Sequence, residues 1–132
     1  KGHSVTCSVS KASDTSKTLA FQARKGTEYG ITVNTATFTG TGGGVTTSNC
    51  SLKLYEDGNE YAGACSGADP SPAVPCQIDG ISIEDGEDGP YITGKVLCIG
   101  LPLTSDVTRQ REITGPSGSG PATFKFTNCR GL

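Results

Sequence analysis

Apolar and polar residues alternate with period two along almost the whole chain. The alternation is clearest between residues 4 and 10, where Val5, Cys7 and Val9 are separated by Ser and Thr. This pattern is typical of β-strands that bury one face. Further strand-like runs cover residues 18–23, 27–39, 50–54, 76–83, 91–99, 107–113 and 124–126. No run has a helical period, and the 19 Gly, 17 Thr and 7 Pro also disfavour helices.

Three local signals refine the expected strands. The apolar phase shifts at Asn34–Thr35 and again at Asp79–Gly80, and each shift predicts a β-bulge. Asp57–Gly58 lies between two strand-like runs and predicts a tight hairpin, because both turn residues need positive φ. Residues 91–99 have apolar side chains on both faces, which favours a central strand.

The length and the one-sided strands together predict the fold class. A chain of 132 residues suits a single domain over residues 1–132. Strands that are apolar on one face must bury that face against another layer. We therefore expect an all-β fold, an antiparallel two-sheet β-sandwich or jelly roll of eight to nine strands stapled by disulfides. A closed barrel is the alternative.

The six cysteines indicate three disulfides and an oxidising compartment, and hence a secreted, extracellular or cell-surface protein. They are Cys7, Cys50, Cys65, Cys76, Cys98 and Cys129. A structural zinc site would need closer pairs of ligands, and the one histidine is His3. Six cysteines permit fifteen pairings. Order along the chain suggests Cys7–Cys50, Cys65–Cys76 and Cys98–Cys129.

Charge and chemistry exclude several classes of function. A net charge of −2 does not favour nucleic acid or an anionic membrane as a partner, and no apolar run is long enough to span a bilayer. A Ser or Cys nucleophile usually needs a histidine base, and His3 is close to the start of the sequence. Carboxylates in turns are solvated and poorly suited to general acid catalysis. We expect neither an enzyme nor a cofactor.

Two residue groups are weak candidates for binding. Glu84, Asp85, Glu87 and Asp88 provide oxygen ligands for calcium, but a solvated turn is the simpler interpretation of these residues. Tyr55 and Tyr61 flank the Asp57–Gly58 turn and could form a contact patch for a protein or a sugar. Cross-strand packing is the simpler interpretation of the two tyrosines.

The remaining function classes are non-enzymatic. The first is a structural protein that self-associates in an extracellular filament, pilus, coat or adhesin, as a homo-oligomer or polymer. The strand of Val5, Cys7 and Val9 would then add to the sheet edge of a neighbour. The alternative is a secreted lectin-like or protein-binding module that uses loops 40–48, 56–60, 66–75 and 84–90 at one end. A third class is a small inhibitor or toxin that presents the proline-rich loop between Cys65 and Cys76.

Overall fold

The computed structural model describes residues 3–39, 43–45 and 49–132. These residues form an all-β fold of nine strands, as the alternating pattern predicted. The strands are β1 (His3–Lys11), β2 (Ser16–Lys25), β3 (Tyr29–Thr39), β4 (Ser51–Glu56), β5 (Asn59–Ser66), β6 (Cys76–Gly86), β7 (Gly89–Leu103), β8 (Asp106–Ile113) and β9 (Ala122–Thr127).

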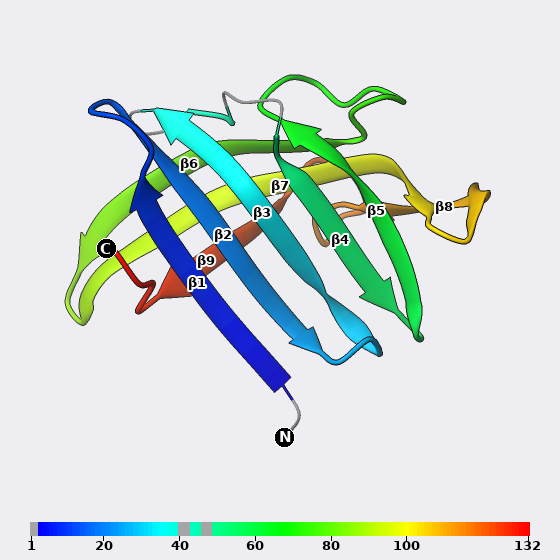
Figure 1. Ribbon diagram of the computed structural model, residues 1–132, viewed down its shortest axis with the longest axis horizontal. Helices are drawn as coiled ribbons and strands as arrows, with labels where there is room; N and C mark the ends of the chain where they lie inside the picture. Colours follow the sequence, from blue (N-terminus) through cyan, green and yellow to red (C-terminus); the bar gives the residue numbers. More distant parts are fainter. Residues whose placement is uncertain (1–2, 40–42, 46–48) are drawn as a thin grey trace.

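The nine strands belong to one mixed sheet that is nearly closed into a barrel. Strands β1 to β5 form an antiparallel meander, which crosses over β6 to β9 in Figure 1. The two layers are joined by a short parallel pairing of β5 with β6 and by an antiparallel pairing of β5 with β7. The prediction of two separate sheets is therefore wrong, because backbone hydrogen bonding continues from one layer into the other.

The length of β7 is what allows a single sheet. Its 15 residues pair with β6 along one edge and with β9 and then β8 along the other edge. Its last residue, Leu103, reaches β5 opposite Tyr61. The apolar side chains on both faces of residues 91–99 predicted a central strand here, but they could not indicate that one strand would contact four others.

The opposite side of the barrel is closed by the chain after β9. The amide of Val9 donates to the carbonyl of Arg130 at 2.7 Å, and the amide of Arg130 donates to the carbonyl of Cys7 at 2.9 Å. The Cys7–Cys129 disulfide lies at the same place. The C-terminal segment thus runs beside the second half of β1 and holds it to β9.

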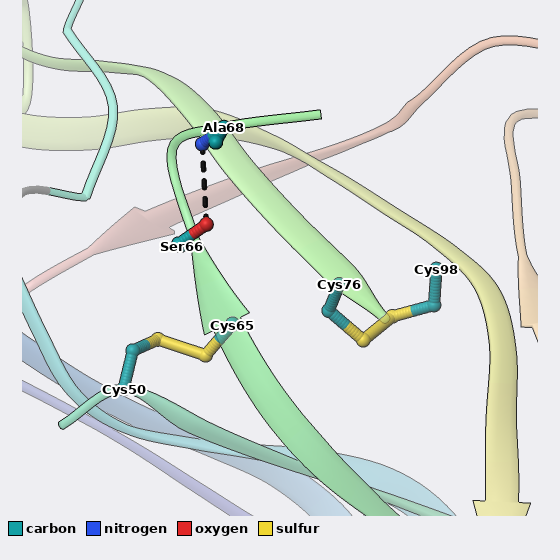
Figure 2. Close-up of a disulfide and its surroundings, with 6 residues drawn as sticks. All are labelled: Cys50, Cys65, Ser66, Ala68, Cys76 and Cys98. Atoms are coloured by element: carbon teal, nitrogen blue, oxygen red, sulfur yellow. Dashed lines mark hydrogen bonds between the residues drawn. A yellow bond between two sulfur atoms is a disulfide. The ribbon is translucent and has the colours of Figure 1, made fainter. Parts of the chain in front are cut away.

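All six cysteines form disulfides, but the pairing suggested by chain order is wrong. The bridges are Cys7–Cys129, Cys50–Cys65 and Cys76–Cys98. Strand register decides the pairing of the last two bridges. Cys76 lies directly opposite Cys98 in the β6–β7 ladder, and Cys50 precedes β4 where β4 pairs with the end of β5. Figure 2 shows these two bridges on neighbouring strands.

The buried core lies between the two layers. Its fully buried large side chains include Leu19, Leu52, Ile78, Ile81, Ile92 and Leu101. On the side near β1 and β9, the ring of Phe21 packs at 5.0 Å from that of Phe124 and at 4.6 Å from that of Phe126. These rings join β2 to β9, two strands that do not pair with each other.

The local predictions are confirmed. Asp57 and Gly58 both have positive φ, 53° and 82°, at the β4–β5 turn. Thr35 has φ of 61° where two residues of β3, Asn34 and Thr35, lie opposite one residue of β2. The β6–β7 register shifts between Asp79 and Ser82, next to Gly80 with φ of 63°. The three irregularities are thus fixed by short-range sequence.

Candidate functional site

The first candidate site is the outer edge of β8. Within the described chain, this strand pairs only with β7, so its other edge is open. Seven of its eight residues are exposed. Val107 has 68% of its surface exposed. An open and exposed strand edge presents unpaired backbone donors and acceptors, which can pair with another chain.

The second candidate site is the first half of β1. In an antiparallel ladder, alternate residues direct their backbone groups to the same side. Cys7 and Val9 bind Arg130 on the outer edge, so Val5 presents its amide and carbonyl on that edge too. The side chain of Val5 is 66% exposed. No ladder partner other than β2 pairs with His3–Thr6 within the described residues.

The predicted association strand is therefore only partly available. Val9 is buried, and Cys7 is bound to Cys129. Their outer edge is already occupied by the C-terminal segment. Of the three residues chosen from the sequence, Val5 alone combines an exposed side chain with an open edge.

A groove of about 490 Å³ crosses the outer face of β1, β2 and β3. This face is turned to the viewer in Figure 1. Two rows of small and polar side chains border the groove. The first row is Thr6, Gln22 and Thr32, and the second is Ser8, Ala20 and Asn34. Asn128 and Arg130 line its end beyond β1.

Sequence reasoning did not identify this groove. The signal was present, because Thr6, Ser8, Gln22, Thr32 and Asn34 are hydroxyl or amide residues at polar positions of the three strands. Strand register, however, decides which polar residues become neighbours. Nothing in the sequence indicated that Arg130 would lie beside Ser8, where the structure has an isolated parallel bridge.

Tyr55 and Tyr61 do not form an exposed contact patch. Tyr55 is 5% exposed and Tyr61 is 2% exposed. The guanidinium of Arg24 covers the ring of Tyr55 at 4.0 Å and donates a hydrogen bond to the hydroxyl of Tyr55 at 3.2 Å. Tyr61 pairs with Leu54, the neighbour of Tyr55, so the two tyrosines belong to opposite faces of the sheet. Cross-strand packing therefore accounts for both rings.

The four carboxylates of the β6–β7 turn remain dispersed. Glu84 accepts a hydrogen bond from the Ser82 hydroxyl at 3.1 Å, whereas Asp85, Glu87 and Asp88 are exposed. Among the described residues, no three His, Cys, Asp or Glu side chains come together in a way that could hold a metal ion. The turn thus gives no geometric support to calcium binding.

Charged contacts hold β8 against the rest of the barrel. The Nε atom of Arg111 lies 2.7 Å from Oε1 of Glu56 on β4. The charge of Glu56 raises the pKa of Arg111. On the same strand, hydrogen bonds from the hydroxyl and amide of Thr108 lower the pKa of Asp106. The Arg111–Glu56 contact favours one orientation of β8, whereas the bond to Asp106 is local to β8 and occupies the amide of Thr108.

The four loops considered for binding do not gather at one end. Of loop 40–48, the structure describes residues 43–45, where Val45 accepts a hydrogen bond from the amide of Gly67 at 3.0 Å. That contact joins it to loop 66–75. Loop 56–60 lies at the other end of β4 and β5, and loop 84–90 forms the β6–β7 turn (Figure 1).

The described part of the chain contains no helix long and apolar enough to cross a membrane. Comparison with protein-family models, curated proteins and solved structures gives no significant match. The three disulfides indicate an oxidising, extracellular type of environment.

Proposed function

We propose that this chain is a secreted structural protein that self-associates through its strand edges, as a subunit of an extracellular filament, pilus, coat or adhesin. The disulfides support the extracellular setting. The first and last strands of the sheet order, β1 and β8, each have an open edge, which supports association between copies. The role is one of contact, and it requires no cofactor.

One observation carries the proposal. Among the described residues, Val5 and Val107 are the two most exposed large hydrophobic side chains. One lies on β1 and the other on β8, the first and last strands of the main sheet order. Exposed apolar residues on an open edge are what soluble β-proteins normally avoid. Both edges therefore have the character of a contact surface.

Charge favours pairing of β8 with β1 of another copy. The open segment Ser4–Thr6 has no charged side chain, so it opposes none of the charges on β8. If β8 instead paired with β8 of a second copy in a central antiparallel register, Arg109 would face Arg109 or Arg111. Like charges directly opposite each other destabilise a ladder.

A contact between two different edges does not close on itself. The β8 edge of each copy would bind the β1 edge of the next, which leaves a free edge at each end of the assembly. Such heterologous contacts build rings or open filaments rather than two-fold dimers. This geometry is why a polymeric subunit fits the two edges better than a simple dimer does.

Sedimentation velocity over a range of concentrations tests the proposal. The native protein should form species heavier than a monomer, with a mass distribution that rises with concentration. Val107→Lys and Val5→Lys should each shift the protein towards monomer, because an edge lysine opposes strand addition. Ile99→Lys is the matched control: Ile99 is 48% exposed but lies on β7, which is paired along both edges.

The control separates edge pairing from simple hydrophobic adhesion. The Ile99→Lys protein should associate as the native protein does. A native protein that stays monomeric at the highest concentrations would overturn the proposal. So would association that Ile99→Lys weakens as much as Val107→Lys does.

A further inference from the structure

We propose that the groove across β1, β2 and β3 binds an acidic oligosaccharide. The groove is separate from the open β8 edge and shares only Val5 and Thr6 with the open part of β1, and a sugar ligand goes beyond self-association. It rests on three features of the groove: walls that both donate and accept hydrogen bonds, a buried hydroxyl without a partner, and a fixed arginine at one end.

The walls of the groove suit a polyhydroxylated ligand. Thr6, Ser8, Gln22 and Asn34 provide hydroxyl and amide groups, each of which both donates and accepts hydrogen bonds. No carboxylate lines the groove. Sugar hydroxyls also both donate and accept, so they match such walls without needing a fixed order of donors and acceptors.

The floor of the groove is formed by a small side chain. Ala20 lies opposite Ser8 on β1 and on the same face as Gln22 two residues along β2. The longer side chains of Ser8, Gln22 and Asn34 around Ala20 therefore stand higher than this floor. A ligand lying across the strands would contact both rows at once.

Thr32 provides an independent sign of a missing partner. Its Oγ1 atom is buried, and in the described chain it is the one buried side-chain polar atom that has no hydrogen-bond partner. Buried polar groups are almost always paired, and an unpaired one needs an explanation. Thr32 lines the groove between Gln22 and Lys53, and a ligand hydroxyl that displaces the atoms now covering Oγ1 would supply the missing bond.

Arg130 selects for an acidic ligand. Its backbone amide donates a hydrogen bond to Cys7 and its carbonyl accepts one from Val9. Its neighbour Cys129 is covalently bound to Cys7. Its side chain is exposed, and no carboxylate of a described residue lies within 4.0 Å of its guanidinium. A guanidinium binds a carboxylate with two parallel hydrogen bonds.

The same features disfavour other ligands. A nucleic acid would need several cations along its backbone, whereas Arg130 is the one charged residue lining this groove. A peptide would need apolar pockets for its side chains. The groove offers an arginine at one end and neutral polar groups elsewhere, which fits a sugar chain that presents a carboxylate to that arginine.

Binding of trigalacturonate, compared with its fully methyl-esterified form, tests the inference by titration calorimetry on the native protein. The charged sugar should bind more tightly. Arg130→Gln should weaken trigalacturonate binding about tenfold, as expected for loss of a charged hydrogen bond, and should leave binding of the ester unchanged. Arg109→Gln is the matched control for charge alone and should change neither affinity.

Two further variants test the groove itself. Thr32→Val removes the hydroxyl but keeps the shape of the side chain, so it should weaken binding of both sugars about fivefold without lowering thermal stability. Ala20→Leu should fill the floor and abolish binding, whereas Ala62→Leu on β5 should not. Sialyllactose, which carries a carboxylate, should likewise bind more tightly than lactose, which carries none.

Three results would overturn the inference: no binding of any acidic sugar, equal losses in Arg130→Gln and Arg109→Gln, or full binding by Ala20→Leu. Val5 and Thr6 belong to both the groove and the β1 edge, so the titrations are repeated in the Val107→Lys protein to make these results independent of polymerisation. The Val107→Lys protein should bind the sugars as the native chain does, because Val107 lies outside the groove.

Discussion

Replacing both Cys7 and Cys129 with alanine should lower the free energy of unfolding by about 5 kcal/mol. The bridge joins residues 122 positions apart, and the entropy lost by the unfolded chain increases with the length of the closed loop. The bridge also holds β1 and the C-terminal segment together at the one place where the barrel closes between β1 and β9.

Removal of the Cys50–Cys65 bridge is the matched comparison. Its residues are 15 positions apart, so the same model gives a loss of about 3 kcal/mol. Urea denaturation of the two double variants and the native protein measures both losses. If the Cys7/Cys129 variant were no less stable than the Cys50/Cys65 variant, the role given to the terminal bridge would be wrong.

Phe21→Ala should destabilise the protein by about 3–5 kcal/mol, the usual cost of truncating a buried phenylalanine. Phe21 is 4% exposed, and its ring contacts those of Phe124 and Phe126. Loss of the ring would leave a cavity and would also separate the two layers where no backbone ladder joins them.

A double-mutant cycle shows whether the aromatic contact itself matters. Phe21 and Phe126 should show a coupling of about 0.5–1.5 kcal/mol, as found for packed aromatic pairs. Phe38 is equally buried but has no ring contact with Phe126 among the described interactions. A Phe38–Phe126 cycle should therefore give a coupling near zero, and an equal coupling in the two cycles would contradict the account.

The strands could be predicted from the sequence because their signals are local. Alternation around Val5 and Val9 depends only on one strand burying one face. The Asp57–Gly58 turn and the bulge near Gly80 depend on φ preferences of a few residues. Each of these features is decided within about ten residues of the chain.

The topology could not be predicted, because it depends on long-range pairing. The short parallel contact of Cys65 with Cys76 turns two expected sheets into one. The same register leaves these two cysteines as neighbours that each bond to a different partner. Order along the chain carries no information about either outcome.

For the candidate sites, too, local features could be predicted from the sequence and long-range contacts could not. The alternation that suggested Val5, Cys7 and Val9 is a local signal, but the C-terminal segment, far along the chain, decides which of them keeps an open edge. The burial of Tyr55 depends on Arg24, which is 31 positions away. The groove depends on Arg130 lying beside β1, a contact between the two ends of the chain.

Amide hydrogen exchange at low and high protein concentration most directly tests the claim that β1 and β8 join copies of this chain. The account predicts that exchange slows with concentration at residues 4–6 and 106–113, while residues 20–22, residues 32–34 and the β6–β7 turn are unchanged. Exchange that is independent of concentration at both edges, or that slows at other surfaces instead, would contradict it.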